Sequence, residues 1–207
     1  MKTLSIRSRW NSMLALTLVT FASVISTPWT SHAIGLDAAF EKLKHEKDDF
    51  VNTGAVCEYV ARLELQEDYP VNRFEIDIGV SYIAGDQVLG ELDVVIRDRK
   101  TGTIPAIGEV KCWKNLKSGL EKAQEQEARF REALLSGGLN PAPAVSFTRF
   151  VEGGELPVSI QAGSFPASLD HISIGQNGAK KVGYDRELEM TLEQLMELRK
   201  RLMGRRH

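Results

Sequence analysis

The chain has 207 residues, of which 43% are hydrophobic and 26% are charged, and its formal net charge at pH 7 is −2. These values are typical of a soluble globular protein with one domain and a true hydrophobic core. They argue against a protein that coats nucleic acid with a strongly basic surface, but not against an enzyme that meets phosphates through metal ions and a few lysines or arginines.

Residues 1–33 are typical of a cleavable signal peptide. Basic residues begin the segment, an apolar run follows at Met13–Ile25, and residues 31–33 offer a small-residue cleavage site. The run is short for a transmembrane helix, which needs about 20 residues. We therefore expect a periplasmic or secreted protein of residues 34–207, with no stable membrane insertion after cleavage. The alternative is an uncleaved inner-membrane anchor through residues 13–28.

The mature portion would carry 23 basic and 28 acidic residues, a formal charge of −5. Export would place Cys57 and Cys112 in an oxidising compartment, where a disulfide is permitted. Cys112 follows Lys111 but points to the opposite face of its predicted strand. A disulfide and two free thiols both remain open, and we favour buried thiols. Neither cysteine has the spacing of a zinc site.

Residue periodicity and turn signals predict one mixed α/β domain over residues 34–207, without internal repeats. Asn52 and Thr53 are expected to cap the second helix, and Ser118 with Glu121 has the spacing of a capping box. The predicted elements in chain order are helices at 36–50 and 54–67, a strand at 73–82, a turn at 85–86, a hairpin at 90–113, a helix at 118–135, strands at 144–151, 156–161, 171–175 and 181–184, and a helix at 192–203.

The predicted hairpin carries the most informative pattern of the chain. Its first strand holds Asp93, and its second holds Glu109 and Lys111, which project to the same side because strand side chains alternate. A tight loop near residues 101–102 would set Asp93 roughly opposite Glu109. The register therefore predicts two carboxylates and one amine within a few ångströms of each other.

This group has the chemistry that phosphodiester hydrolysis requires. A divalent cation neutralises the phosphate and generates a nucleophilic water, and Mg²⁺ or Mn²⁺ prefers carboxylate oxygens as ligands. A lysine beside that water can orient it and stabilise developing charge.

An ordinary half-exposed strand pair would show the same alternation, with Glu109 and Lys111 as a surface ion pair of little energetic value. Two features favour a site instead. Ile107 and Trp113 bracket the polar pair, so that its face is not generally solvated, and Gly108 on the other face permits close packing of another element.

In their order and spacing, these residues resemble the PD-(D/E)XK nuclease superfamily. The match comprises Glu58 on a leading helix, Asp93 on the second core strand, Glu109-Val110-Lys111 on the third, and the helix from Gly119. It covers about residues 52–151 and implies a restriction-endonuclease-like core: helix, three-strand meander, helix and strand, followed here by extra C-terminal strands and a helix. Leu92 stands where many members have a proline before the aspartate.

The resemblance implies a role for each matched residue. Asp93 and Glu109 would bind the metal together with the carbonyl of Val110, and Lys111 would position the attacking water or help to deprotonate it. Glu58 would join the metal shell directly or through water, unless it is an exposed helix glutamate.

Four further residues are candidate nucleic-acid contacts. Lys114 and Lys117 follow the hairpin and would lie near the mouth of the site. Gln124 and Gln126 flank the apolar side of the next predicted helix and could reach a phosphate or a base edge. The alternative for all four is an ordinary solvated surface.

We therefore expect an exported nuclease that depends on Mg²⁺ or Mn²⁺ and hydrolyses phosphodiester bonds in nucleic acid, most naturally DNA. The alternative is a catalytically inactive protein of the same fold that serves binding or assembly in the cell envelope. The sequence leaves open the choice between DNA and RNA and between endonuclease and exonuclease action.

Overall fold

The computed structural model describes residues 34–46, 50–136, 145–151, 154–157, 160 and 165–204. All of them belong to one compact unit of residues 31–207. The predicted signal peptide lies outside the described residues. Within the described ranges, no helix combines the length and the apolar character needed to cross a membrane.

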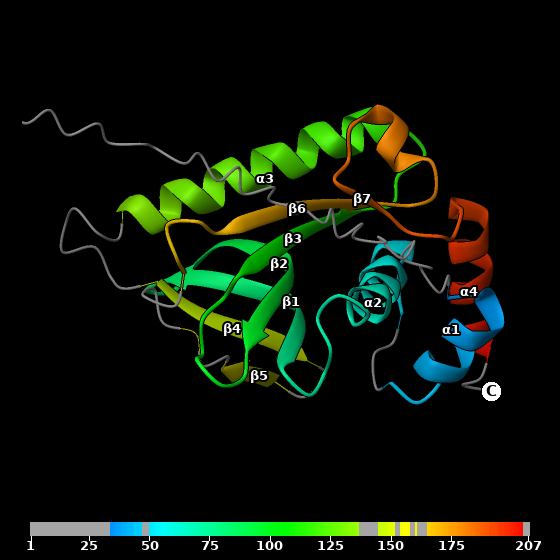
Figure 1. The fold of residues 1–207 in the computed structure, drawn as a ribbon, viewed down its shortest axis with the longest axis horizontal. Coiled ribbons are helices and arrows are strands. Elements are labelled where there is room, and N and C mark those ends of the chain that lie inside the picture. The colour runs from blue at the N-terminus through cyan, green and yellow to red at the C-terminus, as the bar shows by residue number, and fades with distance from the viewer. Residues whose placement is uncertain are drawn as a thin grey trace, which may run out of the picture. The chain divides into compact units, whose positions relative to one another are not determined.

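Seven strands in the described part of the chain form one mixed sheet in the order β5-β4-β1-β2-β3-β6-β7 (Figure 1). Neighbours are antiparallel from β5 to β3, whereas β6 runs parallel to both β3 and β7. The strands are β1 (Phe74–Ala84), β2 (Gln87–Asp98), β3 (Ala106–Lys111), β4 (Val145–Val151), β5 (Gly154–Pro157), β6 (Asp170–Gly175) and β7 (Arg186–Glu187).

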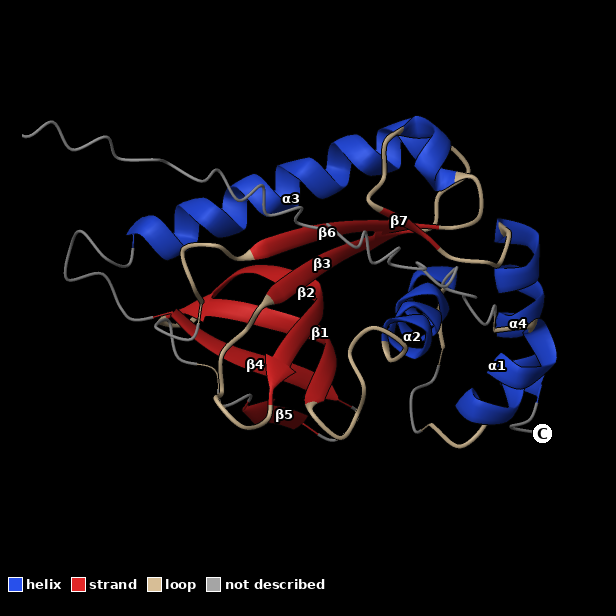
Figure 2. Ribbon diagram, viewed as in Figure 1, coloured by secondary structure: helices blue, strands red, loops and turns tan. Residues whose placement is uncertain are grey.

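Helices cover both faces of this sheet, which makes the fold α/β (Figure 2). One face packs on α3, where Phe130 joins Val95 and Ile107 in a buried cluster. The alternate residues, such as Val94 and Val110, point to the other face and pack with α2 and its neighbours. The helices are α1 (Leu36–Leu43), α2 (Thr53–Leu65), α3 (Leu116–Ser136) and α4 (Leu192–Gly204).

The predicted helix starts are confirmed except at α3. The Asn52 side chain caps α2 by accepting a hydrogen bond of 2.8 Å from the Ala55 N–H, as predicted. The predicted Ser118–Glu121 capping box is wrong, because α3 starts earlier and Asn115 Oδ1 accepts from the Ser118 N–H at 3.2 Å. Asparagine is as good a cap as serine, and here it comes first in the chain.

The first helix and one late strand also differ from the prediction. The helix predicted over 36–50 ends at Leu43, and Phe50 has a positive φ of 50°, which is not helical. The strand predicted over 181–184 is replaced by a 3₁₀ turn, η2 (Ala179–Val182). Gly178 and Gly183 flank it with φ of 92° and 105°, a left-handed conformation that bends the chain instead of extending it.

The strand that completes the core is also not the expected one. The strand predicted at 144–151 exists as β4 but pairs with β1 at the far side of the sheet. The strand that follows α3 in space is β6, which lies parallel to β3. A parallel pair requires a long crossover, which α3 supplies. The hairpin β4–β5 is therefore an insertion between α3 and β6, and the strand predicted at 156–161 begins at Gly154 and ends at Pro157, while residue 161 lies outside the described residues.

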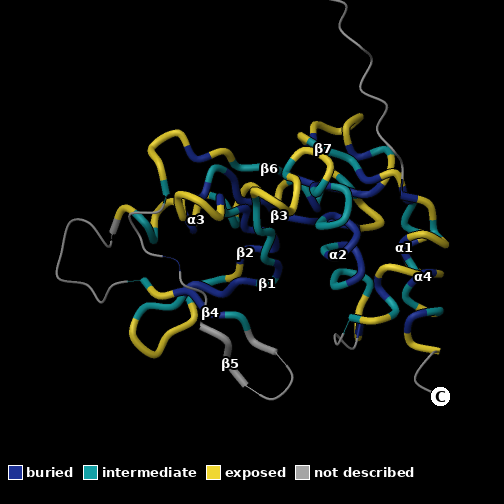
Figure 3. The backbone as a smooth tube through the Cα atoms, turned by 60° about the horizontal axis from the view of Figure 1, so that its bottom comes forward, coloured by how far each residue is buried: buried dark blue, intermediate teal, exposed yellow. Residues whose placement is uncertain are grey.

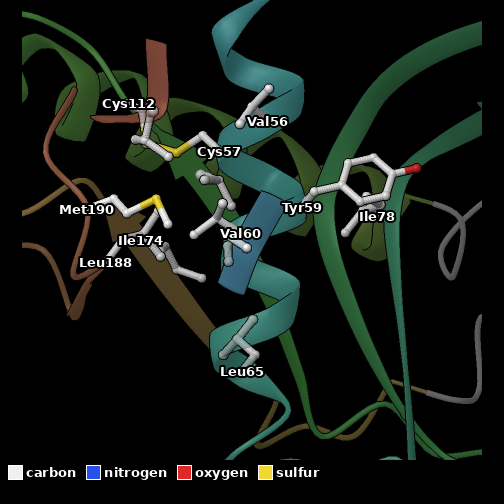
Figure 4. Close-up of a cluster of buried hydrophobic side chains, with 14 of the residues drawn as sticks. Val56, Cys57, Tyr59, Val60, Leu65, Ile78, Cys112, Ile174, Leu188 and Met190 are labelled. Atoms are coloured by element: carbon white, nitrogen blue, oxygen red, sulfur yellow. A yellow bond between two sulfur atoms is a disulfide. The ribbon is translucent and has the colours of Figure 1, made fainter. Parts of the chain in front are cut away.

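Cys57 and Cys112 form a disulfide, contrary to our preference for two free thiols (Figure 4). Their Cα atoms are 6.3 Å apart, and both side chains are buried in the cluster between α2 and the sheet. The expectation failed because it considered only the strand face of Cys112 and not which helix would cover that face. The bond ties α2 to the residue that follows Lys111.

We expect reduction of this disulfide to lower the free energy of unfolding by about 2–4 kcal/mol, because it releases a loop of 55 residues in the unfolded chain. Urea unfolding of the protein with and without reductant measures the difference. Cys57→Ser/Cys112→Ser should behave like the reduced protein and show no further response to reductant. Equal unfolding free energies in both conditions would contradict a structural disulfide.

Candidate active site

The predicted register of the hairpin is confirmed. Val94 pairs with Gly108 and Val95 with Ile107, so that continuing the ladder by one step would set Asp93 opposite Glu109. The ladder stops at that point. The Val110 N–H does not bond to the backbone of β2 but donates to the side-chain atom Asp93 Oδ2 at 2.8 Å. Where β2 and β3 separate, the Asp93 side chain of β2 thus replaces backbone pairing as the hydrogen-bond partner of β3.

The β1–β2 ladder is interrupted at the same place. Ile78 pairs with Val94 and Val80 with Leu92, and between them Gly79 has a φ of 61°. No atom lies within 4 Å of where a Cβ of Gly79 would be. Glycine tolerates this left-handed conformation at low cost, so the sheet can bend beside Asp93 and leave space there.

Lys111 joins the two carboxylates. Its Nζ lies 2.5 Å from Asp93 Oδ2 and 3.0 Å from Glu109 Oε2. The three side chains are buried, with residue exposures of 5% for Asp93, 0% for Glu109 and 8% for Lys111. The adjoining parts of β2 and β3 are likewise coloured as buried in Figure 3. The alternative of a solvated surface ion pair is therefore wrong for these residues.

Burial and mutual charge set the protonation of the group. Burial, reinforced by the negative charge of Asp93, raises the pKa of Glu109 to about 8. Burial alone would lower the pKa of Lys111, but the charges of Asp93 and Glu109 and their hydrogen bonds outweigh it, so that its pKa is raised. Lys111 is therefore an ammonium that donates to both carboxyl groups, of which Glu109 holds its proton below about pH 8.

One oxygen of the group has no partner. Glu109 Oε1 is fully buried and accepts no hydrogen bond within the described part of the chain. A buried carboxylate oxygen left unsatisfied is costly. A hard divalent cation between Glu109 and Asp93 would satisfy it, with the Val110 carbonyl as a further oxygen ligand. The residues present thus fit a Mg²⁺ or Mn²⁺ ion that takes two carboxylates from the protein and its other ligands from water or substrate.

Glu58 is half-buried on α2, next to the disulfide at Cys57. Among the described residues, no group of three His, Cys, Asp or Glu side chains is close enough to hold a metal ion. The expected third acidic ligand thus stays a prediction.

The predicted nucleic-acid contacts surround the site rather than enter it. Lys114, Lys117 and Gln124 are exposed and Gln126 is half-buried. Lys114 lies in the segment that leads from β3 into α3, Lys117 lies in the first turn of α3, and both glutamines lie further along α3. Their contact with nucleic acid stays a prediction.

Sequence reasoning passed over two residues near the triad. Glu91 lies two positions before Asp93, and partial desolvation together with the Asp93 charge raises its pKa. Strand alternation alone would have placed it on the face of Asp93. His171 on β6 is paired in register with Ile107, and its Nδ1 lies 3.2 Å from Glu127 Oε2. His171 is so far from the hairpin in sequence that no local pattern could predict its place beside β3.

An ion pair lies along α3 near His171. Arg131 Nε donates to Glu127 Oε1 at 2.8 Å, one helical turn away. The buried His171 extends the pair into a chain of three side chains. Burial lowers the pKa of His171, and its Nε2 has no hydrogen-bond partner in the described ranges.

Comparison of the chain with protein-family models, curated proteins and solved structures finds no match. The chemistry of the site must therefore be judged from its own geometry.

The raised pKa of Glu109 predicts a pH dependence of stability in metal-free buffer. The unfolded carboxyl ionises near pH 4.5, whereas the folded one holds its proton up to about pH 8. The unfolded state thus binds fewer protons over this interval, so that this group lowers the free energy of unfolding as the pH rises from 4.5 to 8. Chemical unfolding at several pH values should show a steeper decline for the wild type than for Glu109→Gln. Parallel pH profiles would contradict the assignment.

Proposed function

We propose that this protein is a Mg²⁺- or Mn²⁺-dependent nuclease of the PD-(D/E)XK type that hydrolyses phosphodiester bonds, most naturally in DNA. The observation that carries the proposal is the buried triad of Asp93, Glu109 and Lys111 at the point where β2 and β3 separate. The helix-sheet order α2, β1–β3, α3 and parallel β6 supports it as well, because it keeps the order in which that superfamily carries these residues.

Asp93 and Glu109 are the proposed metal ligands. The orphaned Glu109 Oε1 and the two-carboxylate geometry suit a hard cation. When bound there, the ion would neutralise the substrate phosphate and lower the pKa of a water. The low exposure of both carboxylates strengthens their interaction with any cation, since little water screens it.

Lys111 is proposed to orient the water and to stabilise the charge that develops on the phosphate. As an ammonium it donates hydrogen bonds and cannot accept a proton. Its present position shared between both carboxylates implies that it gives up part of these contacts when a cation arrives. This role is narrower than the expectation from sequence, which also allowed Lys111 to help to deprotonate the water.

The sequence pattern of residues 1–33 leads us to propose that the enzyme works outside the cytoplasm, in the periplasm or beyond. The disulfide supports this, because such bonds persist mainly in oxidising compartments.

Substitution of the carboxylates and of the lysine should affect cleavage and metal binding differently. We expect Asp93→Asn and Glu109→Gln to lose cleavage and to weaken Mn²⁺ binding, because each removes a ligand charge. Lys111→Met should reduce the cleavage rate by about 10²–10⁴-fold, the usual contribution of such a group. It should bind Mn²⁺ at least as tightly as the wild type, because the competing ammonium is gone. Cleavage of linear and plasmid DNA and calorimetric titration with Mn²⁺ measure both effects.

Three surface substitutions serve as matched controls: Asp86→Asn, Glu125→Gln and Lys122→Met, all at positions with solvent-exposed side chains. Each should leave cleavage and Mn²⁺ binding unchanged. A folded Lys111→Met variant that loses Mn²⁺ affinity as severely as Asp93→Asn would show that the triad is a structural ion cluster instead of a metal site.

The alternative is an inactive protein of the same fold that serves binding or assembly in the cell envelope. The observation that favours it is the contact of Lys111 with both carboxylates, because a cluster neutralised from within needs no metal. We expect Mn²⁺ to raise the melting temperature of Lys111→Met more than that of the wild type, since the variant leaves two buried carboxylates without a cation. No shift in either protein, together with intact DNA, would favour the inactive protein.

A further inference from the structure

An exposed tryptophan and four exposed lysines lie beside the triad, in the segment that runs from the end of β3 into the first turn of α3 and in the segment between β6 and β7 that contains η2. Trp113 is 44% exposed, which is unusual for so large an apolar side chain. Lys114, Lys117, Lys180 and Lys181 are all exposed as well. We call these five residues the basic-aromatic surface.

Hydrogen bonds hold these two segments together. Gln176 Nε2 donates to the Trp113 carbonyl at 2.7 Å. On the other side of η2, the Tyr184 hydroxyl donates to the Leu116 carbonyl at 3.0 Å. The segment between β3 and α3 is thereby tied to the segment between β6 and β7, which lies beside the N-terminal end of α3 (Figure 1). The lysines of both segments thus lie near the N-terminal end of α3.

Gly119 on α3 shows that this surface adjoins the triad. A Cβ at Gly119 would lie 3.3 Å from Lys111 Cβ and 3.6 Å from Trp113 Cβ. Both side chains therefore start from the same side of β3 and flank the same helical residue. Lys111 is directed into the buried carboxylates, whereas Trp113 reaches solvent.

The two segments that carry this surface are basic, and the first acidic residue after the first segment is the exposed Glu121, one helical turn after Lys117. Residues 110–120 and 174–184 contain no acidic residue. None of the four lysines forms a salt bridge within the described part of the chain. The nearest acids in sequence after the second segment are already engaged: Asp185 accepts from Ser173, and Glu187 accepts from the backbone of η2.

We propose that the basic-aromatic surface binds single-stranded nucleic acid next to the triad, with an unpaired base stacked on Trp113 and the lysines on the phosphates. An exposed aromatic ring can stack on any base, but only when that base is free of its duplex stack. The lysines contribute in proportion to the phosphates that they neutralise. The inference rests on the proposed nuclease function and specifies its substrate as single strands or unpaired ends.

Binding is tested without catalysis, by fluorescence anisotropy of end-labelled oligonucleotides in EDTA. The probes are a mixed-sequence single strand and a blunt duplex of equal length. We expect the wild type to prefer the single strand and Trp113→Ala to weaken single-strand binding about tenfold, the size of one lost base stack. Trp113→Phe should retain most of the affinity. Met196→Ala is the matched control, because Met196 is exposed on α4.

The charge contribution is tested by the salt dependence of the same binding. Lys180→Gln/Lys181→Gln should reduce the slope of log K against log salt concentration by about 1.4, the value for two phosphates of a single strand. Lys42→Gln/Lys200→Gln removes the same charge at two exposed positions elsewhere and should leave the slope unchanged. An equal effect of both double variants would overturn a localised surface.

Unchanged binding by a folded Trp113→Ala variant, or equal affinity for duplex and single strand, would overturn the proposal. Cleavage assays with Mn²⁺ separate this failure from failure of the nuclease function. Cleavage of DNA by a Trp113→Ala variant with wild-type affinity would leave the nuclease and reject the surface. Single-strand binding as expected, with no cleavage under any metal, would support the surface and reject the nuclease.

Discussion

The proposed chemistry depends on the sharing of one ammonium by two buried carboxylates. Asp93 and Glu109 are almost completely buried and could not both remain charged without a cation, because desolvation of an ion costs several kcal/mol. Lys111 supplies that cation at 2.5 and 3.0 Å. Its single charge leaves Glu109 Oε1 without a partner and the pKa of Glu109 raised. Below about pH 8 the proton held by Glu109 completes the neutralisation of the cluster, and a divalent ion would have to replace both that proton and part of the contact with Lys111.

The fold produces this arrangement by interrupting the regular pairing of strands. The β2–β3 ladder ends at Val94, and the β1–β2 ladder misses one pair at the same level, where Gly79 takes a left-handed conformation, before it resumes at Val80 and Leu92. The Asp93 side chain then satisfies a backbone N–H that a continuing ladder would have paired. The same separation that frees the carboxylates from strand pairing also gives one of them a fixed hydrogen bond and hence a fixed position.

Elements distant in the chain hold this arrangement from both sides. The disulfide anchors α2 to the residue after Lys111, and α3 approaches Lys111 closely because Gly119 has no side chain. Tyr184 and Gln176 then attach the η2 loop to the exit of β3. The buried triad and the exposed Trp113 are consequently linked through the same contacts, which bring solvent-facing lysines next to the buried carboxyl groups.

Local residue patterns were enough to predict the strands around the triad, their pairing register and the α/β class. It could do so because alternation and turn length are local properties that set which residues share a face. The packed fold was needed to show that β6 lies beside β3 while β4 joins β1, that Cys57 meets Cys112, and that His171 and the η2 lysines come close to the hairpin. These contacts join segments that are 50 or more residues apart, and their choice depends on how whole faces pack, which no local pattern records.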